Sequence, residues 1–192
     1  ADPGLSMRII GGRAKGRRIA VPPGYTVRPT SDRIKEALFN ILGPLEGQTF
    51  LDLYAGTGSV GLEALSRGAR QVVFVERIPS LVAALKRNLE VFGFSGGYEI
   101  IASDIGPAFS RMVEKELQFD VIFADPPYRK GQIARTVDLL NFHVSLLAPG
   151  GVAILQRARE EPLVIEGDQG MTLVDERKYG DTLLSFMRHS EN

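Results

Sequence analysis

The chain has 192 residues, is 44% hydrophobic and 24% charged, and carries no net charge because 23 basic side chains balance 23 acidic ones. This length suffices for one α/β domain with a substantial core and a small appendage, and the composition is that of an ordinary globular protein. The absence of cysteine excludes disulfides and thiolate metal sites, and no apolar run approaches the roughly 18 residues that cross a bilayer. We therefore expect a cytoplasmic protein that has no membrane segment and no secretory leader.

Basic residues are concentrated near the start of the chain. We interpret residues 1–6, which precede Met7, as a remnant of cloning and exclude them from the fold. Residues 7–35 contain eight basic side chains and one acidic one, so the rest of the chain is acidic overall. Such an asymmetry is typical of a surface that binds a polyanion, although a solvated tail or a solubility patch has the same composition. The candidates for nucleic-acid binding are Arg13, Lys15, Arg17, Arg18, Arg28, Arg33 and Lys35.

The N-terminal pattern predicts a hairpin followed by a helix. Two short β-prone runs flank a Gly- and Arg-rich stretch within residues 8–21, which favours a hairpin. Pro29 blocks a helix before Thr30 or Ser31, either of which can cap one, and apolar residues then recur at helical spacing. We therefore predict a small basic N-terminal extension over residues 7–46.

The remainder of the chain, residues 47–192, alternates between strand and helix patterns. Strands are predicted at residues 49–54, 71–76, 98–103, 119–124 and 151–155, with helices at 58–67, 79–92, 105–117 and 131–147. Such repetition implies a parallel sheet that is covered by helices on both faces. Two β-prone runs at 171–177 and 182–188 break the rhythm and predict an antiparallel hairpin at the sheet edge. The expected fold is one α/β domain with a Rossmann-like sheet, mostly parallel, that ends in an antiparallel C-terminal hairpin.

A glycine-rich loop follows the first predicted strand. Residues Leu51–Gly61 run from that strand through Gly56-Thr57-Gly58 into a helix, so the backbone can approach a ligand closely. Glu76 ends the next strand and Asp104 follows the third, and the carboxyl ends of parallel strands line the crevice where ligands bind. Glu76 is placed to accept from both hydroxyls of a ribose, and Asp104 is placed to meet an adenine amine.

Asp52 bears on the choice between two ligands. The loop contains Gly56-x-Gly58-x-x-Gly61 with Glu76 about 20 residues further on, a pattern that also fits NAD. A pyrophosphate binder would not place a second negative charge at the end of the strand, whereas a ligand with a sulfonium and an ammonium group would accept one. The alternative is that Asp52 caps a helix or satisfies the loop backbone.

The turn Asp125-Pro-Pro-Tyr128 directly follows the apolar run 119–124. Neither proline has an N–H group, so the turn continues neither a sheet ladder nor a helix. It offers rigid acceptors, which are the Asp125 carboxylate and the carbonyls beside the prolines, next to the flat ring of Tyr128. This arrangement suits a planar group with an exocyclic amine, although a proline turn after a strand is also ordinary in α/β proteins.

These motifs resemble those of a known family. Asp52–Gly58 resembles the first motif of class I S-adenosylmethionine-dependent methyltransferases, and Asp125–Tyr128 resembles the catalytic motif of members that methylate exocyclic amino groups. A more specific similarity, from Met7 to about Arg188, is to the bacterial 16S ribosomal RNA guanine-N2 methyltransferase family of the RsmD type. It is carried by Arg8–Gly12, Arg28–Leu42, Leu62–Ala69 and Lys178–Asp181. One departure is Gln156, where a Glu is expected in the family.

The resemblance implies methyl transfer from S-adenosyl-L-methionine to the N2 amine of a specific guanine. Asp125, Pro126, Pro127 and Tyr128 are then the catalytic residues, with Tyr128 stacked on an extruded base or, alternatively, packed in the core. No metal is required. The implied cofactor-binding residues are Asp52, Tyr54, Ala55, Gly56, Thr57, Gly58, Glu76, Arg77, Asp104, Ile105 and Asp125.

The implied partner is 16S ribosomal RNA within an assembling or assembled small ribosomal subunit, and we expect a monomer whose methyltransferase domain spans residues 47–192. Three alternatives remain open: an adenine-N6 or other amino-group methyltransferase on RNA or DNA, an NAD-dependent oxidoreductase, and an RNA-binding assembly factor without activity. Asp52 and the lack of an obvious proton relay disfavour the oxidoreductase. The intact acidic series Asp52, Glu76, Asp104 and Asp125 argues against the inactive factor.

Overall fold

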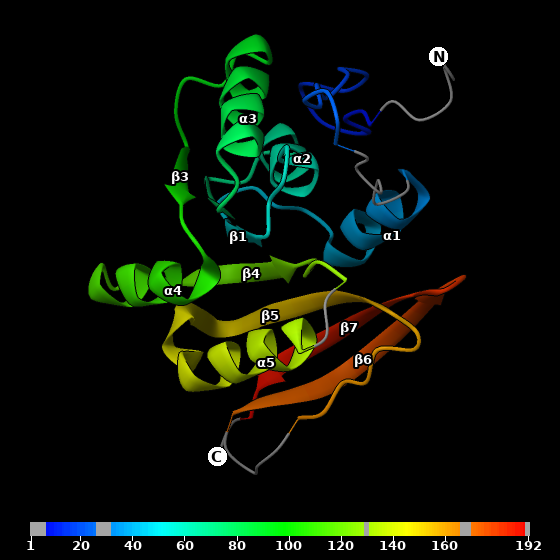
Figure 1. Ribbon diagram of the computed structural model, residues 1–192, viewed down its shortest axis with the longest axis vertical. Helices are drawn as coiled ribbons and strands as arrows, with labels where there is room; N and C mark the ends of the chain where they lie inside the picture. The colour runs from blue at the N-terminus through cyan, green and yellow to red at the C-terminus, as the bar shows by residue number, and fades with distance from the viewer. Residues whose placement is uncertain (1–6, 26–31, 129–130, 166–169, 191–192) are drawn as a thin grey trace.

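The structure, a computed structural model, describes residues 7–25, 32–128, 131–165 and 170–190 of the chain (Figure 1). Its strands are β1 (Thr49–Leu53), β2 (Gln71–Glu76), β3 (Tyr98–Ala102), β4 (Phe119–Ala124), β5 (Leu147–Ala158), β6 (Met171–Tyr179) and β7 (Thr182–His189). Within the described residues they form one seven-stranded sheet in the order β3-β2-β1-β4-β5-β7-β6. Strands β1 to β5 pair in parallel, whereas β7 pairs antiparallel with both β5 and β6. The predicted Rossmann-like sheet with an antiparallel C-terminal hairpin is confirmed.

The α-helices of the described chain cover both faces of this sheet (Figure 1). Their bounds are α1 (Asp32–Leu42), α2 (Ser59–Ser66), α3 (Pro79–Val91), α4 (Ile105–Glu114) and α5 (Gln132–Phe142). Helices α1, α2 and α3 pack in the same core cluster as Phe50 and Phe74, whereas α4 and α5 pack in the cluster of Leu51 and Val73. Successive side chains of a strand point to opposite faces, so each buried strand supplies both clusters.

The connection between α5 and β5 differs from the prediction. The helix predicted to reach residue 147 ends at Phe142, and a short 3-10 helix, Val144–Leu146, leads into β5. His143 leaves the helical conformation with φ of −114° and ψ of 43°, and its ring packs against Phe109 with the ring centroids 5.5 Å apart. Strand β5 therefore begins at Leu147 and not at residue 151.

The N-terminal segment, residues 7–25, is not a regular hairpin. An antiparallel bridge joins Arg8 to Arg18, and beside it Ile9 N–H donates to the carbonyl of Arg17 over 2.9 Å and Ile19 N–H to that of Met7 over 2.8 Å. The next donors, those of Ile10 and Gly11, bond to α2 and not to the opposite arm. Two adjacent N–H groups donate to the Glu63 carboxylate over 2.9 and 2.8 Å. The predicted hairpin is therefore present only as a short pairing of residues 7–9 with residues 16–19, because a side chain of α2 takes the donors that would extend it.

Gly12 is required where the N-terminal segment meets α2. Its φ is +76°, a conformation that favours glycine, and an added Cβ would lie 1.8 Å from the carbonyl oxygen of Ser66. The N–H of Ala14 donates to the Oγ of the same serine over 2.9 Å. Ile9 and Ile19 are buried in the core cluster of α1 to α3. The segment is thus seated on α2 through both its backbone and its apolar side chains.

Beyond this seat, the N-terminal segment follows α3 from its C-terminal end to its N-terminal end. Arg17 Nη1 donates to the carbonyl of Val91 at the last residue of α3, over 2.8 Å. Asn88, three residues earlier on α3, holds the backbone of Ala20 through two hydrogen bonds. Ser80 Oγ donates to the hydroxyl of Tyr25 over 3.0 Å in the first turn of α3. The segment therefore ends on the side of the sheet where the parallel strands end.

Candidate functional site

A pocket of about 230 Å³ lies at the carboxyl ends of β1, β2, β3 and β4. Its lining comprises Tyr54, Gly56, Val75, Glu76, Arg77, Ile78, Leu81, Ser103, Asp104, Ile105, Asp125 and Pro127. The structure thus brings together most of the residues that were predicted to hold a cofactor, together with part of the proline turn. The sequence analysis did not identify Val75, Ile78 and Leu81, which form the apolar wall of the pocket, because their pattern is that of ordinary core residues.

The three glycines of the loop between β1 and α2 differ in what an added Cβ would contact. Gly56, with φ of +59°, lines the pocket and has open space where a Cβ would point. A Cβ on Gly58 would lie 2.3 Å from Leu85 Cδ1, and one on Gly61 would lie 2.3 Å from the ring of Phe74. The first glycine therefore leaves room at the pocket, and the other two let α2 pack closely on α3 and β2.

Glu76 is fixed in the pocket by two backbone N–H groups. Its Oε2 accepts from Gly56 and its Oε1 accepts from Ile78, each over 2.8 Å. An ionised carboxylate has about four acceptor sites, so each oxygen can accept one more hydrogen bond. Glu76 is therefore oriented to receive two hydroxyl groups from a ligand.

Asp52 supports the glycine loop through a hydrogen bond to its backbone and does not line the pocket. It is 2% exposed, and its Oδ2 accepts from the N–H of Gly61 over 2.9 Å. Burial raises the pKa of the Asp52 carboxyl to about 8. This geometry does not support direct contact with a cationic ligand, and it matches the alternative in which Asp52 satisfies the loop backbone. Ala55, Thr57 and Gly58 likewise belong to the loop without lining the pocket.

Two neighbouring residues of α5 hold side chains of the pocket. Arg135 Nη2 lies 2.8 Å from Asp104 Oδ2, and this pair holds the pKa of the Asp104 carboxyl below its usual range. The hydroxyl oxygens of Tyr54 and Thr136 are 2.8 Å apart. Burial raises the pKa of Tyr54, so the phenol stays protonated. Sequence reasoning missed Arg135 and Thr136, because only the folded chain brings α5 to the ends of β1 and β3.

The proline turn after β4 opens onto the same pocket. Asp125 is partly buried and Pro127 is exposed, and both line the pocket. Pro126 is buried, whereas Tyr128 is 53% exposed. The core-packing interpretation of Tyr128 is therefore wrong. Gln156, the position that departs from the family pattern, is partly buried on β5 opposite Leu184.

The residues predicted to bind RNA occupy different environments. Those that the structure describes as exposed are Arg13, Lys15, Arg17, Arg18 and Arg33. The guanidinium of Arg13 lies 4.2 Å from the ring centroid of Phe94, just beyond α3. Like the contact of Arg17 with α3, this places the side chain at the end of α3 that is remote from the pocket. Arg28 lies outside the described residues.

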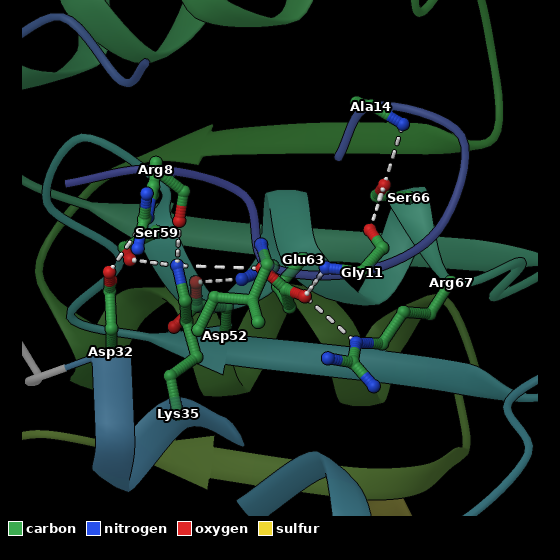
Figure 2. Close-up of polar contacts among 12 residues, drawn as sticks. Arg8, Gly11, Ala14, Asp32, Lys35, Asp52, Ser59, Glu63, Ser66 and Arg67 are labelled. Carbon is green, nitrogen blue, oxygen red and sulfur yellow. Dashed lines mark hydrogen bonds and ion pairs between the residues drawn. The ribbon is translucent and has the colours of Figure 1, made fainter. Parts of the chain in front are cut away.

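Lys35 is buried, so the prediction that it binds RNA is wrong. Its side chain is 1% exposed, and Nζ donates to the carbonyl of Arg8 over 2.5 Å and to Ser59 Oγ over 3.2 Å (Figure 2). Burial lowers the pKa of Lys35 even though Glu63 lies 3.4 Å away. Lys35 precedes Leu38 by three residues on α1, and this spacing places it beside the buried face of the helix.

Figure 2 shows how Glu63 joins three parts of the chain. Its carboxylate accepts from the N–H groups of Ile10 and Gly11, from Arg67 Nε over 2.8 Å, and lies within ion-pair distance of Lys35. We call these five residues the Glu63 cluster. Two cations and two N–H groups surround one carboxylate that is itself 0% exposed, so its buried charge is compensated.

The described residues contain no group of three or more His, Cys, Asp or Glu side chains that could hold a metal ion. In the same part of the chain, no helix is long and apolar enough to cross a bilayer.

The sheet order, the glycine loop and the acids at the carboxyl ends of β2 and β3 define an α/β protein with the Rossmann-like methyltransferase fold. The structure of the Escherichia coli protein yhhF is similar, with a TM-score of 0.81 and 29% identity over 98% of this chain and 100% of that one. A hypothetical protein of Thermus thermophilus has a TM-score of 0.78 and 33% identity over 93% and 97% of the two chains.

The chain belongs to the family described as conserved hypothetical protein 95, the family of RsmD-type methyltransferases, whose sequence model matches residues 7–188. It is 34% identical to the ribosomal RNA small subunit methyltransferase D of Haemophilus influenzae, over 91% of this chain and 89% of that protein. It is 38% identical to the protein of the same name from Escherichia coli K12, over 70% of this chain and 66% of that protein.

Proposed function

We propose that this protein transfers a methyl group from S-adenosyl-L-methionine to the exocyclic N2 amine of a guanine in 16S ribosomal RNA of the small ribosomal subunit. The observation that carries the proposal is that Asp125 and Pro127 line the same pocket as Glu76 and Asp104. One pocket therefore presents acceptors for a nucleoside beside acceptors for an amine. The names of the relatives support ribosomal RNA as the substrate.

The pocket residues fit S-adenosyl-L-methionine. Glu76 presents two fixed oxygens for the ribose hydroxyls, and Asp104 presents an acceptor for the purine amine. Apolar surface for the flat ring comes from Val75, Ile78, Leu81 and Ile105. When bound, this cofactor supplies a methyl group on a sulfonium that is already activated for transfer.

In this proposal the turn after β4 holds and orients the acceptor amine. The N2 lone pair of guanine is delocalised into the ring, so the free amine is a poor nucleophile. By accepting the amine hydrogens, Asp125 and the carbonyl of Pro126 direct the lone pair toward the donor, and the proton released leaves to water or to Asp125. Such alignment can contribute ~7 kcal/mol or more. The exposed ring of Tyr128 stacks on the base after its extrusion from a helix.

The exposed basic residues of the N-terminal segment and α1, together with Arg28, are proposed to bind RNA phosphates. Helix α3 spans 13 residues, or about 20 Å, so Arg13 and Arg17 lie well away from the pocket. They would therefore hold RNA that flanks the target base. Replacing Arg13, Lys15, Arg17 and Arg18 by Ala should weaken RNA binding and reduce the salt slope by about 0.7–0.9 for each phosphate that the variant no longer neutralises. An unchanged slope would make this surface merely structural, and Arg177→Ala on β6 is the control.

The decisive experiment measures methyl incorporation from labelled cofactor into small subunits and naked 16S RNA from cells that lack this protein. Mass spectrometry then identifies the modified nucleoside. We expect N2-methylguanosine with the native protein, and Asp125→Ala should lower the rate ~100-fold or more while its affinity for S-adenosylhomocysteine stays within twofold.

Each other outcome selects a named alternative. Methylation at adenine N6 would replace the guanine assignment with the other amino-group chemistry, which the same turn can serve. Binding to small subunits without any methylation would indicate an assembly factor. Near-native turnover by Asp125→Ala would show that the turn does not hold the amine. We also propose that the protein acts as a monomer, which light scattering in solution tests.

A further inference from the structure

Asp104 is held by a residue that stands outside the pocket. Its Oδ1 accepts from the N–H of Ile105 over 2.9 Å at the start of α4, and its Oδ2 accepts from Arg135 Nη2 over 2.8 Å. Arg135 projects from α5 and is absent from the described residues that line the pocket. Its hydrogen bond to a residue of the pocket lining is the one to Asp104, so the guanidinium acts on a ligand mainly through that carboxylate.

Thr136, the next residue of α5, makes a corresponding contact with Tyr54. The hydroxyl of Thr136 donates to the carbonyl of Gln132 over 2.7 Å, so its single hydrogen is already used. Tyr54 must then donate to Thr136 Oγ1, at 2.8 Å. Tyr54 has φ of +57°, a conformation that is unfavourable for a residue other than glycine, so this hydrogen bond helps to hold it. Two adjacent residues of α5 thus fix two side chains of the pocket.

We propose that Arg135 determines cofactor specificity by positioning the Asp104 carboxylate to select a purine that carries a 6-amino group. The inference rests on the proposed function, because it assigns Asp104 to the purine of the cofactor. An ionised carboxylate offers only acceptors, so it pairs with the amine of an adenosyl ligand. A 6-oxo purine would place a second acceptor against it and leave both groups unpaired, which disfavours its binding.

Arg135 also stabilises the ionised form of the selecting group. The charged and titratable groups that face Asp104 are Arg135 from α5, Arg77 after β2 and Tyr54 after β1, and Glu76 shares the pocket. The Arg135 hydrogen bond is the largest cause that lowers the pKa of Asp104. Without it that pKa moves back toward the ordinary range of an aspartate, where the carboxyl is still ionised at neutral pH, so a variant that lacks the guanidinium loses the position of the carboxylate and not its charge.

The test compares S-adenosylhomocysteine with its deaminated counterpart, S-inosylhomocysteine, by calorimetry. The native protein should bind the adenosyl ligand at least ~10-fold tighter. Arg135→Met should bind it about tenfold more weakly than the native protein and should discriminate several-fold less between the two ligands. Arg135→Lys should restore part of the preference, because an ammonium keeps the charge but lacks the planar fork.

The matched control is Arg177→Met on β6, which removes a guanidinium that pairs with Asp175 at the same distance of 2.8 Å, away from the pocket. It should behave like the native protein. An unchanged preference in Arg135→Met, or tighter binding of the adenosyl ligand by that variant, would overturn the inference and leave the proposed function standing. If the native protein bound neither ligand, the proposed function would fall and this inference with it.

Discussion

Glu63 and Glu76 make similar contacts in two regions of the molecule, with different consequences. Each carboxylate accepts from two backbone N–H groups over 2.8 to 2.9 Å. Glu63 is fully buried between Lys35 and Arg67. In the described residues no lysine or arginine forms an ion pair with Glu76, which lines the pocket. Glu63, which has counter-ions, holds parts of the chain together. Glu76, which pairs with no lysine or arginine of the described chain, has acceptors directed at a pocket and can bind a ligand there.

The strongest test of this contrast removes the charge of Glu63. Glu63→Gln leaves Lys35 buried without its counter-ion, and we expect the free energy of unfolding to fall by about 3–5 kcal/mol. Denaturant titration measures this change. Glu99→Gln, which removes surface ion pairs with Lys115 and Arg111, is the control and should change stability by about 0–1 kcal/mol. If the two variants lost equal stability, the compensated charge would have no special role.

The same substitution at Glu76 should act on binding more than on folding. Glu76→Gln keeps one carbonyl acceptor but presents an amide to a backbone N–H group, and it loses the charge-assisted bonds that we propose Glu76 makes to ribose. We expect affinity for S-adenosylhomocysteine to fall about 10- to 100-fold, equivalent to roughly 1.5–3 kcal/mol. Stability should fall less than in Glu63→Gln. Calorimetric binding and denaturant titration on the same samples would contradict the contrast if the order of the two effects were reversed.

Asp52 sharpens the comparison, because it is buried with a backbone donor but pairs with no lysine or arginine in the described chain. Its pKa is raised from 3.8 to about 8, so between these values the folded state keeps a proton that the unfolded state has released. The free energy of unfolding must then fall as pH rises through this window, by up to about 1.4 kcal/mol per pH unit, and level off above it.

Asp52→Asn keeps an acceptor for Gly61 and does not titrate. Its stability relative to the native protein should therefore increase from pH 5 to pH 8 in the absence of ligand. Parallel stability profiles for the two proteins would show that Asp52 does not hold the extra proton.

Local patterns predicted the sheet, the glycine loop and the turn at Asp125, because strand alternation, glycine geometry and proline chemistry act over a few residues. They did not predict the burial of Lys35, which depends on Glu63 arriving from a different helix. Nor did they predict Arg135, whose role depends on α5 crossing to the end of β3. Charge composition alone marked Lys35 as an RNA ligand, although its helical position already put it beside the core.

The contacts between the N-terminal segment and α2 distinguish positions that tolerate substitution from positions that do not. A methyl group at Gly12 would collide with the backbone of α2, whereas one at Gly16 would meet open space, although the φ of +84° there still favours glycine. Lys15 and Arg18 are exposed to solvent and take no part in those contacts. The electrostatic character of this surface can therefore be redesigned residue by residue, while the scaffold beneath it stays as it is.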